Sequence, residues 1–207
     1  DIAARSFNAV AKSKETMKTD IILSGVGGQG ILSIAAVIGE AALKEGLYMK
    51  QAEVHGMSQR GGSVVTYVKY GSKVNSPIVN EGEADLILAF EQLEAARWLQ
   101  YLKKDGTLII NTQKIDPMSV IIGNSIYPDG VLDAINKAGA KTTNLDALSL
   151  AVSAGSAKAV NVVLIGVMAS HMDLNRDVWI NAIKNTVPEK FLEMNLKAFD
   201  LGYNYNK

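Results

Sequence analysis

The chain has 207 residues, of which 48% are hydrophobic and 20% are charged, so we expect it to bury a full apolar core. Its 21 basic and 21 acidic residues cancel, which removes the electrostatic basis for binding nucleic acid or an anionic membrane surface. The absence of cysteine excludes a disulfide framework, thiolate catalysis and any iron–sulfur cluster held by this chain alone.

Residues 1–16 are polar and poorly patterned, and Met17 stands just before the first convincing strand. We therefore expect residues 1–16 to be an N-terminal extension, peripheral or added upstream of the native start, and residues 17–207 to form one domain. The longest strongly apolar runs are much shorter than the roughly 18 to 20 residues of a membrane span. With no signal-peptide pattern at the first residues, the sequence favours a cytoplasmic protein.

Short β-rich runs alternate with helical patterns through the first two thirds of the chain. A continuous apolar run at residues 20–24 predicts a strand covered on both faces, and a helical spacing of apolar residues follows over 31–42. The turn at Asp105 and Gly106 is expected to end a helix over 91–103. Further strands are predicted at residues 48–52, 64–69, 86–90, 107–111 and 141–145, with a short extended run at 125–127 and a helix near 131–137. This α/β alternation indicates a mainly parallel sheet between helices.

The last third of the sequence has a different pattern. Residues 161–170, 176–185 and 189–199 all have helical spacing, and Pro188 is well placed for a first helical turn. No linker rich in glycine, serine or proline separates this part from the rest. We expect a helical C-terminal part within the same domain.

A glycine-rich turn follows the first predicted strand and precedes the first predicted helix. It contains Gly25, Gly27, Gly28, Gln29 and Gly30, in the pattern G-x-G-x-x-G. In this context the glycines permit a tight turn, and the helix N-terminus favours an anion such as a pyrophosphate. An acidic residue, Glu53, follows near the position that holds an adenosine ribose in dinucleotide sites. The residues alone leave two interpretations open: a nucleotide site, or glycines that only allow tight packing or receive a neighbouring chain.

A second glycine-bearing turn, residues 55–62, follows the second predicted strand. At the carboxyl end of a parallel strand it would face the same crevice as the first turn. Its density of polar side chains favours positioning of a ligand or contact with a partner subunit over direct catalysis, and an internal hydrogen-bond network that braces the loop is the alternative. The candidates in this turn are His55, Ser58, Gln59, Arg60, Gly61 and Gly62. We assign no catalytic residue and no metal ligand to this chain.

The two turns together resemble the gamma-type subunits of 2-oxoacid:ferredoxin oxidoreductases, most closely those of the indolepyruvate type. Two further segments carry the resemblance, which spans most of the chain: residues 161–166, and a tail pattern of Pro188, Lys190, Asn195, Ala198, Phe199 and Gly202. The resemblance implies a Rossmann-like three-layer α/β/α sandwich. It also implies an enzyme that converts an indolepyruvate- or arylpyruvate-type 2-oxoacid to acyl-CoA, CO2 and reduced ferredoxin.

Such an enzyme uses thiamine diphosphate, iron–sulfur clusters and coenzyme A. This chain has no cysteine for a cluster and no intact G-D-G…N motif for thiamine diphosphate, so the resemblance places both cofactors on a partner subunit that also serves ferredoxin. The chain would then supply subunit contacts and access to the active site, and would be inactive alone. Two alternatives stay open: a self-contained NAD(P)-dependent oxidoreductase that uses the glycine-rich turn, and an assembly scaffold whose crevice binds nothing.

Overall fold

A six-stranded sheet organises the residues that the computed structural model describes, 17–55 and 61–206. The strand order is β2-β3-β1-β4-β5-β6. The pairs β1 with β4, β4 with β5 and β5 with β6 are parallel, whereas β3 runs antiparallel to both β1 and β2. β2 therefore runs in the direction of β1, although β3 lies between them. The strands are β1 (Lys18–Val26), β2 (Tyr48–His55), β3 (Ser63–Gly71), β4 (Ala84–Ala89), β5 (Leu102–Asn111) and β6 (Lys141–Leu145).

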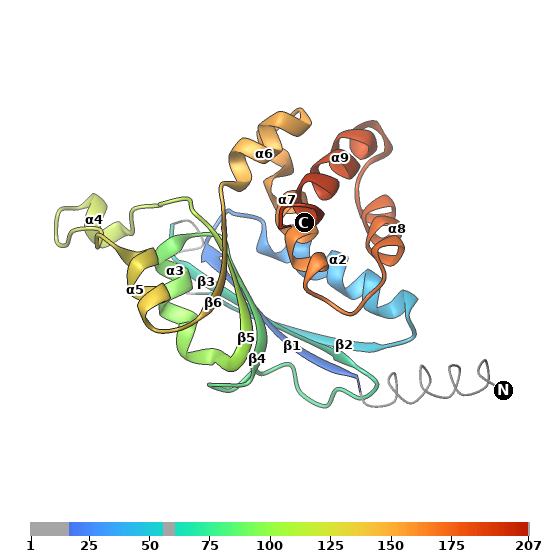
Figure 1. The fold of residues 1–207 in the computed structure, drawn as a ribbon, viewed down its shortest axis with the longest axis horizontal. Helices are drawn as coiled ribbons and strands as arrows, with labels where there is room; N and C mark the ends of the chain where they lie inside the picture. Colours follow the sequence, from blue (N-terminus) through green and yellow to red (C-terminus); the bar gives the residue numbers. More distant parts are fainter. Residues whose placement is uncertain (1–16, 56–60, 207) are drawn as a thin grey trace.

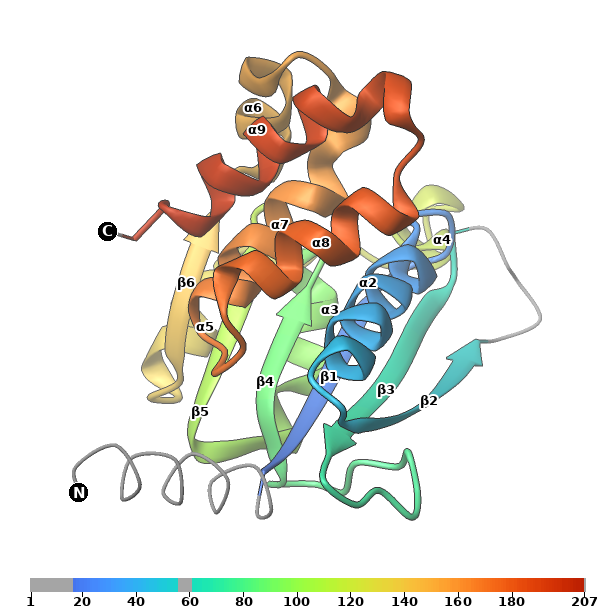
Figure 2. The same cartoon turned by 90° about the vertical axis from the view of Figure 1, so that its right-hand side faces the viewer.

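Helices cover both faces of this sheet, which confirms the predicted α/β/α sandwich with a helical C-terminal part (Figure 1). One layer contains α2 (Ile31–Lys44), α7 (Val160–Ser170) and α8 (Arg176–Thr186), and it continues beyond the strand ends in α6 (Ala147–Ala154) and α9 (Leu192–Tyr203), as Figure 2 shows. The other layer contains α3 (Gln92–Trp98) and α5 (Val131–Lys137), while α4 (Met118–Ile121) projects to one side (Figure 1). Among the helices of the described ranges, none is long and apolar enough to cross a membrane.

The central strand β1 is buried on both faces, as its continuous apolar sequence predicts. Ile21 and Leu23 belong to the core beneath α2, α7 and α8, whereas Ile22 belongs to the core beneath α3 and α5. All three are fully buried. Because successive side chains of a strand point to opposite faces, one short run of large aliphatic residues anchors both helical layers.

Two glycines allow α7 and α9 to touch through their backbones. A Cβ added to Gly166 of α7 would collide with the carbonyl oxygen of Phe199 and lie 2.8 Å from the amide nitrogen of Tyr203. A Cβ added to Gly202 of α9 would collide with the carbonyl oxygen of Val163. These contacts give a physical reason for two glycines in the segments that carry the sequence resemblance.

The last described residues bind the edge strand β6. The hydroxyl of Tyr205 donates to the Asn144 carbonyl oxygen at 3.0 Å, and the side-chain amide of Asn206 donates to the Thr143 hydroxyl at 3.1 Å. The carbonyl of the next residue, Leu145, accepts from Thr112 on the β5 side. Since successive carbonyls of a strand point to opposite sides, the Asn144 carbonyl faces the open side of β6, and the chain terminus covers it.

The structure differs from the sequence-based expectation at four places. Asp105 and Gly106 do not end a helix: α3 and a short 3-10 turn end by Tyr101, and both residues lie inside β5. There the pairing jumps from Ala84 with Leu102 to Leu86 with Thr107, so the dipeptide forms a bulge. Residues 125–127 form no strand, and the short helices α4 and α6 were not expected. The predicted extension over residues 1–16 lies outside the described residues and stays a prediction.

Replacing Gly166 with alanine should lower the free energy of unfolding by about 1–3 kcal/mol, because the new methyl group must push two helix backbones apart. Gly39→Ala in α2 is the matched control, since its Cβ would meet only the flexible end of Met49, at 3.5 Å. We expect that variant to be neutral or stabilised by up to about 1 kcal/mol through helix propensity. Urea denaturation measures both changes, and equal effects of the two substitutions would contradict the close helix contact.

Candidate functional site

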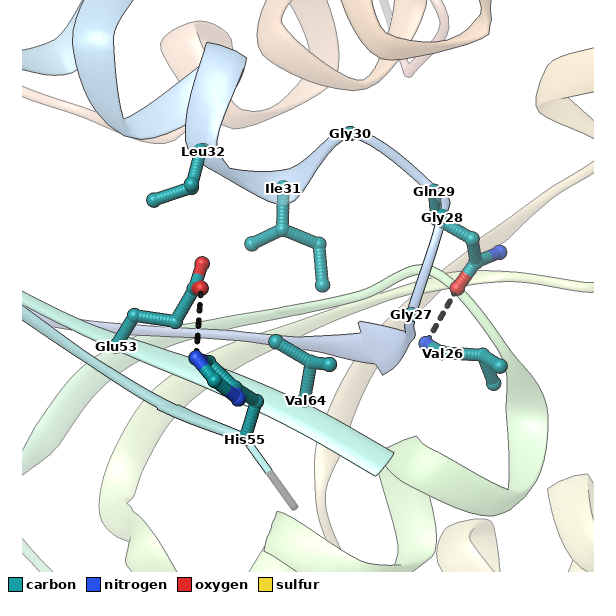
Figure 3. A pocket seen from close by; sticks show the side chains of 10 residues that line it. All are labelled: Val26, Gly27, Gly28, Gln29, Gly30, Ile31, Leu32, Glu53, His55 and Val64. Carbon is teal, nitrogen blue, oxygen red and sulfur yellow. Dashed lines mark hydrogen bonds and ion pairs between the residues drawn. The ribbon is translucent and has the colours of Figure 1, made fainter. Parts of the chain in front are cut away.

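The first glycine-rich turn joins the end of β1 to the start of α2. Gly28 and Gly30 have φ angles of +101° and +74°, which side chains with a Cβ rarely adopt, and Gly30 precedes the first residue of α2. The side chain of Gln29 folds back under the turn, where its Oε1 accepts from the Val26 amide at 2.7 Å (Figure 3). The turn is therefore held in shape by its own glutamine.

The second turn packs directly against the first. The amide of Gly27 donates to the Gly62 carbonyl oxygen at 2.8 Å, and the Gly61 amide donates to the Gly27 carbonyl oxygen at 3.4 Å. The structure thus brings the two predicted turns to one edge of the sheet, at the carboxyl ends of β1 and β2. Three of the predicted site residues, Ser58, Gln59 and Arg60, lie outside the described residues.

A cavity of about 390 Å³ separates the first turn from β2. Alternation along β2 directs Glu53 and His55 to the cavity side, where His55 Nε2 lies 4.0 Å from Glu53 Oε1 (Figure 3). The opposite wall is the N-terminus of α2, whose first backbone N–H groups have no partner within the helix. The lining residues are Val26, Gly27, Gly28, Gln29, Gly30, Ile31, Leu32, Glu53, His55 and Val64.

A second cavity, of about 400 Å³, lies on the other side of the same turn. The side-chain amide of Asn161, in the first turn of α7, donates to the Gly30 carbonyl oxygen at 3.2 Å. Lys158 supplies a cation to this cavity, and Gln113 reaches it from the carboxyl end of β5. Sequence reasoning missed the site positions of Lys158, Asn161 and Gln113. Gln113 follows a predicted parallel strand at its ligand-binding end, and Asn161 begins a segment that carries the resemblance, whereas nothing in the sequence marked Lys158.

Two buried carboxylates underlie this edge of the sheet. Glu91 Oε2 accepts from the Glu94 amide at 3.0 Å and caps α3, while Glu94 Oε2 accepts from the Ser63 hydroxyl at 2.6 Å. Burial raises the pKa of the Glu94 carboxyl, and the Ser63 hydrogen bond and the charge of Arg97, at 3.3 Å, oppose that shift. Because Ser63 begins β3, this carboxylate ties the second turn to α3. No motif in the sequence marked either glutamate as part of this edge.

Polar groups gather around both cavities. A helix N-terminus and the nearby Lys158 favour an anionic group, and the Glu53 and His55 pair adds a polar wall. Within residues 17–55 and 61–206, no three histidine, aspartate or glutamate side chains gather to hold a metal ion. The predicted roles of the eleven candidate residues in contacting a ligand or partner stay predictions.

Comparison with known proteins decides the family. The family described as pyruvate ferredoxin/flavodoxin oxidoreductase matches residues 20–205. The chain belongs to this family. It is 43% identical over 190 residues to the indolepyruvate oxidoreductase subunit IorB of Thermococcus kodakarensis, an alignment that covers 88% of this chain and 93% of the relative.

Solved structures agree with this assignment. The gamma subunit of a keto/oxoacid ferredoxin oxidoreductase from Geobacter sulfurreducens superimposes with a TM-score of 0.68 at 25% identity, covering 90% of this chain and 96% of that one. A 2-oxoglutarate:ferredoxin oxidoreductase from Magnetococcus marinus, with 2-oxoglutarate, coenzyme A and succinyl-CoA bound, shares the fold with a TM-score of 0.69 at 19% identity. The alignment covers 92% of this chain but 31% of that longer one.

The chain is therefore a subunit of a 2-oxoacid:ferredoxin oxidoreductase, an enzyme that oxidises an oxo compound with ferredoxin as acceptor and acts as a complex. The predicted resemblance is confirmed. Nothing in the comparisons supports the self-contained NAD(P) enzyme. The topology also departs from the dinucleotide pattern that suggested it, because the antiparallel β3 separates Glu53 and its strand from β1.

Glu94→Gln should change how stability depends on pH. The folded-state pKa of Glu94 is raised above its ordinary value of 4.5, so the folded chain binds this proton more tightly than the unfolded chain. The stabilisation is full below about pH 4.5 and is lost as the pH rises through the folded pKa. We expect the unfolding free energy of the variant, relative to the original chain, to increase from pH 4.5 towards neutrality. Urea denaturation across that range measures it, and parallel curves would refute the raised pKa.

Proposed function

We propose that this chain is the access-forming subunit of an oxidoreductase that converts an indolepyruvate- or arylpyruvate-type 2-oxoacid to acyl-CoA, CO2 and reduced ferredoxin. Similarity to an indolepyruvate oxidoreductase subunit over 88% of the chain is the observation that carries the substrate class. The enzyme as a whole uses thiamine diphosphate, iron–sulfur clusters and coenzyme A. In the cell we place it in the cytoplasm.

The residues of this chain do not fit the cluster or thiamine diphosphate. Clusters are held by cysteine thiolates, and the sequence contains no cysteine. The Asp-Gly pair that partly matches a thiamine motif lies within β5, where a Cβ on Gly106 would be 2.9 Å from the Ala84 carbonyl oxygen. That backbone is packed inside a sheet and offers no diphosphate site. Both groups therefore belong, in this proposal, to a thiamine-binding, cluster-bearing partner subunit.

What remains for this chain is to shape the approach to the partner's active site. Gly61 and Gly62 are hydrogen-bonded to Gly27 and so help to fix the first turn, which has one cavity on each side. The N-terminus of α2 and Lys158 favour a phosphate-bearing molecule such as coenzyme A, and closure by the partner would exclude water from the reaction. We propose that Arg60 contacts a coenzyme A phosphate or a partner carboxylate, since a guanidinium binds either with two hydrogen bonds.

Reconstitution of the enzyme from its purified subunits tests both the subunit role of this chain and the substrate class. The purified chain alone should show no 2-oxoacid-dependent reduction of a viologen dye under anaerobic conditions. With the partner subunit and coenzyme A, indolepyruvate should be oxidised with a higher kcat/KM than pyruvate, 2-oxoglutarate or ketoisovalerate. Activity of the isolated chain would refute the subunit role. A preference for an aliphatic 2-oxoacid would refute only the substrate class.

The Arg60→Ala substitution in the assembled enzyme tests whether Arg60 in the crevice binds coenzyme A or the partner subunit. If Arg60 binds a phosphate, the KM for coenzyme A should rise about 10- to 100-fold, which is the loss of one charge-assisted contact, with kcat little changed. If it binds a partner carboxylate, subunit association should weaken instead. Lys104→Ala, which removes an exposed cation of β5, is the control and should change neither quantity. If neither the KM for coenzyme A nor subunit association changes in Arg60→Ala, the result favours the assembly scaffold whose crevice binds nothing.

A further inference from the structure

Residues 115–127 form an arm that leaves the body of the protein after β5 and carries α4 (Figure 1). Four large aliphatic side chains of this arm face water: Met118 is 55% exposed, Ile121 66%, Ile122 60% and Ile126 89%. Few soluble proteins expose such side chains together unless another surface covers them. We call residues 115–127 the apolar arm.

The apolar arm has a defined backbone shape. The amides of Ile121 and Ile122 donate to the carbonyl oxygens of Pro117 and Met118, each at 3.0 Å. The Asn124 amide then turns back to the Ser119 carbonyl oxygen at 2.8 Å. This network fixes the backbone that carries the exposed aliphatic side chains. A surface that is ordered before contact loses less entropy on binding than a flexible segment does.

Both ends of the apolar arm are fixed to the same buried atom. Glu91 Oε1 accepts from the Ile115 amide at 3.3 Å and also from the Tyr127 hydroxyl. Burial, together with this hydrogen bond, raises the pKa of the Tyr127 hydroxyl, so it stays protonated as a donor. Glu91 is only 1% exposed and is the second residue after β4. A single carboxylate therefore holds the base of the arm against the carboxyl edge of the sheet.

That edge also carries the two cavities and a second apolar surface. The glycine-rich turn follows β1, the apolar arm follows β5 and α6 follows β6, and these strands are mutually parallel in direction. On α6, Leu148 and Val152 are 48% and 57% exposed and lie one helical turn apart. Figure 2 shows α4 and α6 beyond the same ends of the strands. The exposed aliphatic side chains thus flank the crevice.

We propose that the apolar arm is the anchor of this subunit, inserted into an apolar recess of the catalytic partner subunit of the oxidoreductase. The inference rests on the subunit role of the chain. In the Magnetococcus marinus enzyme the same fold is one part of a longer chain, so the partner here corresponds to a separate polypeptide. A second copy of this chain is a poorer occupant, because it has no cysteine to hold the clusters of the proposed reaction, so a different subunit must still bind this chain.

The test compares Ile121→Asp with Leu43→Asp. Leu43 is also 66% exposed, but it lies near the end of α2, at the opposite edge of the sheet. Both variants should unfold at the same urea concentration as the original chain, because neither side chain is part of the core. Size-exclusion chromatography with light scattering should show that Ile121→Asp raises the Kd for the purified partner subunit about 10- to 100-fold. Leu43→Asp should bind as the original chain does.

Hydrogen exchange provides the independent measurement. In the complex of the original chain with its partner, the amides of residues 118–126 should exchange more slowly than in the free chain. Equal affinity of Ile121→Asp and the original chain, with unchanged exchange at these amides, would overturn the proposal. So would a homodimer of the original chain that Ile121→Asp dissociates. Binding is measured without any 2-oxoacid, so a wrong substrate class would leave this result unaffected.

Discussion

The pairing of β1 with the antiparallel β3 is the interaction on which the positions of the glycine turns, the buried glutamates and the base of the apolar arm depend. Its register runs from Lys18 with Gly71 to Val26 with Ser63, and the hydrogen bond from Gly27 to Gly62 extends the ladder into both turns. Ser63 then binds Glu94, and Glu91, which caps the same helix, holds the base of the apolar arm. A continuous path of hydrogen bonds therefore connects the crevice with the proposed anchor.

Amide side chains complete this edge where the strand ladders end. Gln29 and Asn111 both donate to the Phe90 carbonyl oxygen, at 3.2 and 3.1 Å, and Asn111 accepts from the Ala147 amide at 3.2 Å. They join the ends of β1, β4 and β5 to the start of α6. Neutral amides satisfy buried backbone groups without adding charge, so the charges at the cavities come from the helix N-termini, Lys158 and the Glu53 side chain beside His55. This edge is built to be rigid and polar next to exposed aliphatic surface.

The sequence predicted those strands that a local pattern of residues is enough to locate. Continuous apolar runs located β1, β4 and β5, because strands covered on both faces have no polar alternation. The direction of β3 was not predicted, since a strand of nine residues carries no local signal for whether its neighbour is parallel. Asp105 and Gly106 resemble a turn in sequence, but here the glycine serves close packing, because a Cβ at Gly106 would lie 2.9 Å from the Ala84 carbonyl oxygen. Asn161 lies far from Gly30 in sequence and meets it only through the fold, and Glu91 meets Ile115 and Tyr127 in the same way, so no spacing rule finds these contacts.

The two edge strands of the sheet differ in how far other residues of the chain cover them. Tyr205 and Asn206 form hydrogen bonds with residues of the edge strand β6. The other edge strand, β2, is largely exposed. Fibre growth by strand addition requires two unprotected borders on each molecule, so that every added copy presents a new one. A strand that approached β6 would have to displace Tyr205 and Asn206 first, so β2 is the more accessible border of the described sheet. Residues 205 and 206 thus disfavour strand addition at one border and, with it, open-ended growth of an aggregate.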